Sequence, residues 1–77
     1  MTARQTRDPR IDPEVGDVVK RGRIIRTVDH FERDPVDNSI PVVYCTERHV
    51  NGFSRNVMPF LSQWRKWAAK GEVENGV

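Results

Sequence analysis

The sequence predicts a mainly β domain: a small antiparallel sheet of four to five strands, or a partly open barrel, with one amphipathic helix at its C-terminal end. Three observations lead to this fold. Residues 15–55 are rich in β-branched and aromatic side chains that alternate with polar ones, a pattern typical of strands. Asn51-Gly52 is a strong hairpin signal, because both residues tolerate positive φ. From residue 57 the apolar period changes from two to about 3.6, which indicates a helix.

The first two strands are expected at residues 15–20 and 23–31. Pro13 and Gly16 favour a turn into the first strand, and Arg21-Gly22 forms a tight reversal before the second. Alternation divides the side chains of the second strand between two faces. One face carries Ile24, Arg26 and Val28, and the other carries Ile25, Thr27 and Phe31.

The next strands are expected at residues 40–48 and 53–55. Residues 33–39 are a loop by composition. In the strand that follows, Val42, Tyr44 and Thr46 share one face, and Val43 and Cys45 share the other. The connections are short and contain no crossover helix, so the strands must run antiparallel.

The helix is predicted over residues 57–70. Its apolar face carries Val57, Phe60, Leu61, Trp64, Trp67 and Ala68. Asn56 is the expected N-cap, which places Pro59 in the first turn, where a missing N–H is harmless. Gly71 fits the C′ position that ends a helix.

The chain of 77 residues is expected to form a single domain over residues 14–71. Residues 1–13 are polar and hold two prolines, so we expect a mobile N-terminal arm. Residues 72–77 are expected to be a disordered tail. The single cysteine excludes an internal disulfide, and no stretch has the length of a membrane span or a signal peptide, so the cytoplasm is the expected location.

Charge is unevenly distributed along the chain. The net charge is only +2, but residues 48–70 carry five basic side chains and no acid, whereas residues 34–47 carry only Asp34, Asp37 and Glu47. The basic section is a candidate anion-binding face. The alternative is that these cations simply solvate a helix and a strand edge.

Cations from neighbouring strands extend this candidate site. Arg23, Arg26, Arg48 and Arg55 are interpreted as sharing one face of the sheet. Trp67 lies among basic residues and either contacts a nucleic-acid base or a protein partner, or covers the core as a lid, while Trp64 belongs to the core. Tyr44 is a stacking platform if exposed and a core aromatic if buried. The full set of candidate binding residues is Arg23, Arg26, Arg48, Arg55, Arg65, Lys66, Trp67 and Lys70.

The sequence contains no catalytic or cofactor motif. Cys45, His30 and His49 lack the paired spacing and fourth ligand of a structural zinc site. Cys45 lies in mid-strand, and nothing nearby supplies an oxyanion hole or a third group to orient a nucleophile. We therefore expect neither a metal, nor a cofactor, nor an enzyme.

Short motifs are spread over residues 8–70: Asp8-Pro9-Arg10, Asp12-Pro13, Gly16-Asp17-Val18-Val19, Arg26-Thr27-Val28, Val43-Tyr44, and Phe60-x-x-x-Trp64-x-x-Trp67. This pattern resembles small uncharacterised proteins of tailed phages and prophages. The opening, Pro13-x-x-Gly16-Asp17-Val18-Val19, is similar to that of Src-homology-3-like barrels. The resemblance implies a small barrel from a phage-type genome and assigns no activity.

Together these features predict a non-catalytic binding module of phage type. The leading hypothesis is contact with DNA or RNA through residues 48–70, Arg23 and Arg26. The alternative is a protein–protein adaptor, or an inhibitor of a host protein, that uses Trp67, a strand edge or the N-terminal arm. The sequence predicts no membrane partner and leaves the oligomeric state open.

Overall fold

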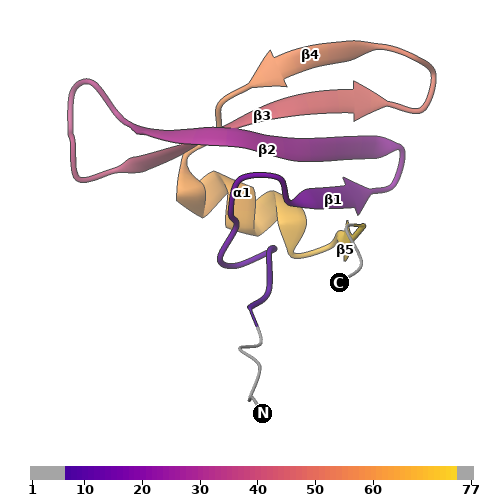
Figure 1. Ribbon diagram of the computed structural model, residues 1–77, viewed down its shortest axis with the longest axis horizontal. Coiled ribbons are helices and arrows are strands. Elements are labelled where there is room, and N and C mark those ends of the chain that lie inside the picture. The colour runs from indigo at the N-terminus through magenta and orange to yellow at the C-terminus, as the bar shows by residue number, and fades with distance from the viewer. Residues whose placement is uncertain (1–6, 75–77) are drawn as a thin grey trace.

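The computed structural model describes residues 7–74 and confirms a mainly β fold with one C-terminal helix (Figure 1). The elements follow in the order β1 (Val18–Arg21), β2 (Ile24–Arg33), β3 (Pro41–His49), β4 (Ser54–Val57), α1 (Leu61–Ala68) and β5 (Glu72–Val73). The strands form one antiparallel sheet in the order β4-β3-β2-β1-β5. Within residues 7–74 this sheet has two free edges, so it does not close into a barrel.

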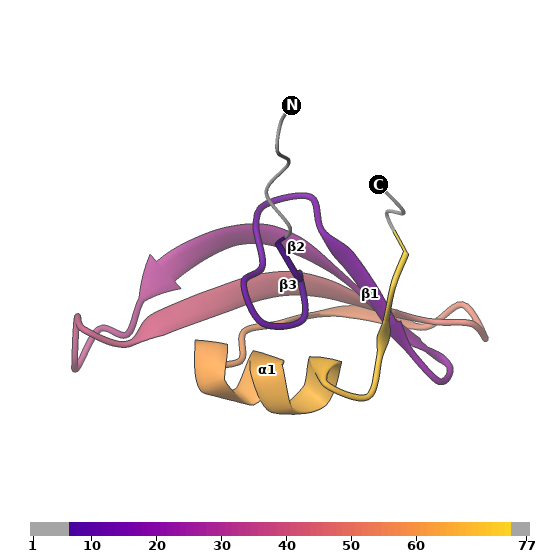
Figure 2. The same cartoon turned by 90° about the horizontal axis from the view of Figure 1, so that it is seen from below.

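One face of the sheet packs on the helix. In Figure 2 the sheet arches over α1, which lies on the concave side. The core between them holds Val19, Val28, Val43 and Cys45 from the sheet and Trp64 and Ala68 from α1. We call the side of the sheet that carries these core residues the helix-side face. The opposite side, which no described helix covers, is the bare face.

A β-bulge in β2 places Phe31 on the face opposite to the predicted one. Val28 pairs with Cys45, but His30 pairs with Tyr44, so Asp29 is an extra residue in β2. The bulge shifts the alternation by one residue, and Phe31 pairs with Val43 on the helix-side face. The prediction that Phe31 shares a face with Ile25 and Thr27 is therefore wrong.

The helix begins four residues later than predicted. Asn56 and Val57 belong to β4 and pair with β3, and the Val43 N–H donates to the Pro59 carbonyl at 2.8 Å. Pairing with β3 thus keeps the chain extended as far as Phe60, which is the N-cap. The Gln63 side chain closes the helix start, because its Oε1 accepts from the Phe60 N–H at 2.9 Å.

The expectation of a mobile arm is wrong for residues 7–13, while residues 1–6 lie outside the described part. The Trp64 indole Nε1 donates to the Pro9 carbonyl at 3.0 Å, and Arg65 Nε donates to the Ile11 carbonyl at 2.7 Å. Arg7 forms an ion pair with the buried Asp17. The segment is thus held by main-chain carbonyls and ion pairs rather than by large apolar side chains.

The end of the domain also differs from expectation. Glu72 and Val73 form β5 and pair with β1, so a disordered tail is wrong for residues 72–74, and residues 75–77 lie outside the described part. Ala69 is the C-cap of α1. Gly71, two residues later, is buried against β1, and a Cβ there would lie 2.8 Å from Val19 Cγ1.

Candidate anion-binding face

A buried carboxylate lies at the centre of the candidate site. Glu47 is on the helix-side face of β3, with Arg26 of β2 and Arg55 of β4 directly opposite on either side. Its side chain is 1% exposed. Arg26 reaches Glu47 Oε2 through Nε at 2.9 Å and Nη2 at 2.8 Å. Arg55 Nε donates to Oε1 at 2.8 Å, and His49 Nε2 lies 3.2 Å from the same oxygen.

These contacts keep Glu47 ionised. Burial opposes the charged form, but the hydrogen bonds from Arg55, Arg26 and His49 outweigh it and lower the pKa of Glu47 from 4.5 to about 2. The carboxylate fixes the positions of two arginines while neutralising only one positive charge. The cluster of Glu47, Arg26 and Arg55 therefore keeps a surplus positive charge.

Trp67 borders this cluster and is half-buried. The guanidinium carbon of Arg26 lies 4.4 Å from the centroid of the Trp67 ring, a cation–π contact. On the core side, the rings of Trp64 and Trp67 are 5.7 Å apart. Arg21 Nη1 lies 3.4 Å from the Trp67 carbonyl oxygen. Trp67 thus lies as a lid between the core and Arg26, and one face of its ring is already occupied.

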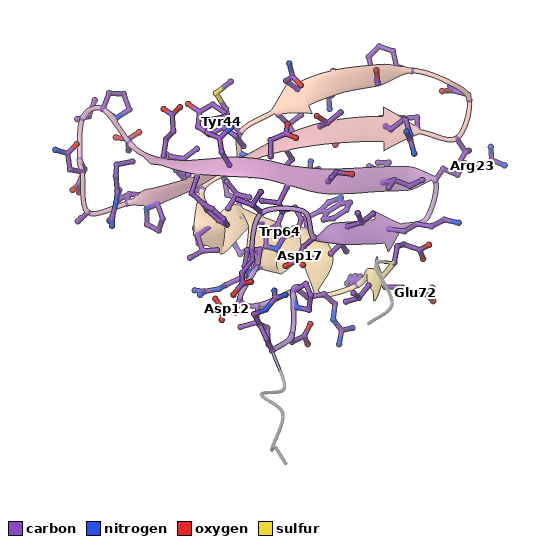
Figure 3. All side chains as sticks on the ribbon, viewed as in Figure 1. Asp12, Asp17, Arg23, Tyr44, Trp64 and Glu72 are labelled. Atoms are coloured by element: carbon purple, nitrogen blue, oxygen red, sulfur yellow. The ribbon has the colours of Figure 1, made fainter. Side chains whose placement is uncertain are left out.

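The eight predicted binding residues do not form one surface. Arg26, Arg55 and Trp67 come together on the helix-side face. Arg48 follows Glu47 in β3 and therefore points to the bare face. Arg23 lies in the β1–β2 turn, at the end of the sheet (Figure 3). The prediction that Arg23, Arg26, Arg48 and Arg55 share a face is wrong, because adjacent strand residues face opposite ways.

The remaining three predicted residues are exposed on α1 or just after it. Arg65 Nε is bound to the Ile11 carbonyl. Lys66 and Lys70 are four residues apart and lie on the outer surface, away from Trp64 and Ala68. They follow Trp67 around the helix, on the side away from Arg65.

Strand register sorts the charges of the sheet between its two faces. Among the described strand residues, those with charged side chains on the helix-side face are Arg21, Arg26, Arg33, Arg55 and a single carboxylate, Glu47. The bare face carries Lys20 and Arg48 together with Asp29, Glu32 and Glu72. The strands are thus net positive on the helix-side face and net negative on the bare face, and Lys66 and Lys70 add to the positive side.

Glu47, Arg21 and His49 are site residues that the sequence prediction missed. The sequence assigns Glu47, with Asp34 and Asp37, to an acidic section apart from basic residues 48–70, whereas the structure places it between Arg26 and Arg55. A usable signal was present: Val43, Cys45 and Glu47 alternate along one strand. That spacing places a carboxylate on a core face, where it needs cationic partners.

Tyr44 is half-buried on the bare face. Its ring stacks on His30, with centroids 4.5 Å apart and planes 16° apart. His30 Nε2 in turn lies 3.1 Å from Glu32 Oε2. His30 therefore covers one face of the Tyr44 ring, and the Glu32 carboxylate lies beside His30.

Cys45 belongs to the core. Burial raises the pKa of its thiol to about 12, so the thiol stays protonated. Among residues 7–74, no three His, Cys, Asp or Glu side chains gather in a way that could hold a metal ion. No helix in the same range has the length and apolar character needed to cross a membrane.

Comparison with protein-family models, with curated proteins and with solved structures gives no match to this chain.

Proposed function

We propose that this protein is a non-catalytic binding module that contacts the phosphate backbone of DNA or RNA through its helix-side face. One observation carries the proposal: strand register gathers arginines on that face and leaves three carboxylates on the other. Lys66 and Lys70 continue the positive surface over the helix. The phage-type origin and the cytoplasmic location implied by the sequence belong to the same proposal.

The arrangement suits phosphate better than bases. A guanidinium carries five N–H donors, and Glu47 leaves donors of Arg55, whose side chain is 57% exposed, for a second anion. Arg26 is only 14% exposed and contributes its charge from beneath. Because Arg55 is already held by a buried carboxylate, less side-chain entropy is lost when it binds phosphate. Arg26 covers a face of Trp67, which disfavours base stacking there. Contacts of this kind carry little sequence preference.

The test is a fluorescence-anisotropy titration of single- and double-stranded oligonucleotides at several salt concentrations. About three phosphate contacts give a log–log salt slope of about −2 to −3, with micromolar or weaker affinity at physiological salt. The double variant Lys66→Glu/Lys70→Glu should abolish binding. Glutamates near the helix C-terminus cost only some tenths of a kcal/mol, so the fold should persist, as far-UV circular dichroism would report.

The matched control is Lys20→Glu/Arg48→Glu, which makes the same change in net charge on the bare face. It should keep most of the binding. Equal losses in both double variants would mean that binding follows net charge rather than a face, and would contradict the proposal. Absence of binding at low salt would also exclude it.

A protein partner is the second candidate, favoured by the surroundings of β4. Phe53 is 53% exposed just before this edge strand, and Met58 is 57% exposed just after it. Exposed apolar side chains at a strand edge favour pairing with another chain. Such binding would change little with salt, which separates it from phosphate binding.

A further inference from the structure

The outer edge of β4 has free backbone groups at defined positions. The carbonyls of Phe53 and Pro59 accept from the N–H groups of His49 and Val43. In an antiparallel ladder such inward-bonded residues alternate with outward-facing ones, so Arg55 and Val57 also face β3. The N–H and C=O groups of Ser54, Asn56 and Met58 therefore point away from the sheet. No described strand pairs with them.

This edge is short, but it lacks several of the features that usually protect a sheet edge. β4 contains no Lys and no Pro, and its one charged side chain, Arg55, is bound to Glu47. Large apolar side chains are exposed at both of its ends, Phe53 and Met58. The other edge strand, β5, is only two residues long. Of the two edge strands, β4 is therefore the one more available for pairing with another strand.

We propose that β4 pairs with β4 of a second copy of this chain, antiparallel and about a two-fold axis. Asn56 lies opposite its own counterpart, and Ser54 lies opposite Met58 of the second copy. In this register Asn56 exchanges both of its outward hydrogen bonds with its counterpart. A second copy is the occupant because the edge is self-complementary: Asn56 is the middle one of three outward-facing residues, so an antiparallel second β4 offers a matching group to each of them.

Charge and strand length select the register. Centring the axis on Arg55 would place two guanidinium groups directly opposite each other, which is unfavourable. Centring it on Val57 would shift the pairing beyond the end of β4. Centring it on Asn56 places Arg55 opposite Val57 of the second copy, so the like charges are offset.

The two copies then present their helices on the same side. Residues directly opposite in an antiparallel pair point to the same face, so the helix-side faces of both copies join into one surface. Arg55 of each copy lies close to the junction, and Arg26 lies two strands further in. This consequence rests on the proposed function and would lengthen the track for a phosphate backbone, whereas the dimer itself does not depend on nucleic acid.

The first experiment is disulfide cross-linking of the full chain. Opposed residues of a hydrogen-bonded pair have Cα atoms about 5.5 Å apart, within the range of a disulfide. Asn56→Cys should therefore give a cross-linked dimer under mild oxidation. Ser54→Cys, on the same strand and face, should not, because it lies opposite Met58. The native Cys45 is buried and does not compete. Absence of a cross-link at position 56, or equal cross-linking at 54, would overturn the proposal.

The second experiment is sedimentation equilibrium from micromolar to millimolar protein without nucleic acid. A four-residue strand buries less than the about 1,200 Å² of a stable interface, so we expect a weak monomer–dimer equilibrium. Met58→Lys should reduce the association constant at least tenfold. Val36→Lys, at a 92% exposed residue in the β2–β3 loop, should not change it. A monomer over the whole range, or equal effects of both substitutions, would reject the dimer and leave the proposed function untouched.

Discussion

At the scale of single residues, Glu47 is the unusual feature of this small protein. A carboxylate that is 1% exposed would be costly without partners, and here Arg26, Arg55 and His49 all reach it. The same contacts hold two arginines in place, one of them against the Trp67 ring. Glu47 thus contributes both to stability and to the placement of the cations on the helix-side face.

Glu47 should make the protein sensitive to acid. A pKa that folding lowers from 4.5 to about 2 gives stability that is complete above pH 4.5 and is lost as the pH falls toward 2. The difference corresponds to roughly 3 kcal/mol. We expect the free energy of unfolding, measured by urea denaturation, to fall progressively between pH 5 and pH 2.

The variant Glu47→Gln provides the control. It should be less stable than the wild type at pH 7 and should lose most of this acid dependence. Some will remain, because hydrogen bonds from Arg10 and from Ser39 lower the pKa values of Asp8 and Asp37. If wild type and variant lose stability in parallel from pH 5 to pH 2, another carboxylate dominates.

The two tryptophans should differ in their effect on stability. Trp64 is fully buried and bonded to the Pro9 carbonyl, so Trp64→Ala should destabilise the protein by about 3–5 kcal/mol. Trp67 is half-buried, and Trp67→Ala should cost clearly less. Thermal or urea unfolding measures both, and equal losses would show that Trp67 is as much a core residue as Trp64.

At the scale of elements, Gly71 is needed for close packing between the end of α1 and β1, and not for a positive φ at the helix end. The sequence places it as the residue that ends the helix through positive φ, but its φ is not positive. It instead allows the end of α1 to approach β1, since a Cβ would lie 2.8 Å from Val19 Cγ1 and 3.0 Å from the Lys20 carbonyl oxygen. Close packing, not backbone freedom, requires glycine.

Gly71→Ala should therefore destabilise the domain by about 1–3 kcal/mol, as overpacking does. The neighbouring Lys70→Ala, at an exposed position, should change stability by less than about 0.5 kcal/mol. Denaturant unfolding of both variants provides the comparison. A neutral Gly71→Ala would mean that β1 and the helix end move apart at little cost.

Local signals predicted the strands well and the helix boundaries less well. Alternation and turn residues located β2, β3 and the Asn51-Gly52 hairpin to within about two residues, because these signals are local. The start of α1 was misplaced, since bonds to β3, distant in sequence, keep residues 57–60 extended. Residues 7–13 and β5 were missed for the same reason: their partners lie in α1 and β1.

At the scale of the whole molecule, the middle strands of the sheet should be the most resistant to local unfolding. β2 and β3 each have a partner strand on both sides, whereas β4 and β5 are edges. We expect the slowest amide hydrogen exchange in β2 and β3, including the Val28 and Val43 amides, which donate to Asp17 and Pro59. Amides of Ile11 and Asp12, bonded to Asp8, should exchange at intermediate rates. NMR exchange measurements that found β5 as protected as β3 would contradict this order.

The sequence predicts the charge of the candidate site, but not how its residues are arranged on the sheet. The sequence indicates a basic surface near Trp67, and Arg26 does contact the Trp67 ring. The placement of Arg48 on the other face depends on register and could not be derived from charge runs alone. The role of Glu47 depends on which strands become neighbours, which is a property of the whole sheet.

The bulge at Asp29 also predicts where this chain can lose a residue without a change of register. Asp29 is an extra residue beside the Val28–Cys45 pair, and its side chain only accepts a hydrogen bond from Thr46 Oγ1 on the bare face. Deleting it would leave His30 opposite Tyr44 and Phe31 opposite Val43. Deleting Thr27 instead would move Arg26 and its neighbours to the opposite face and separate Arg26 from Glu47. Deletion of Asp29 should therefore be tolerated, whereas deletion of Thr27 should destabilise the domain, a difference that urea denaturation of the two variants would measure.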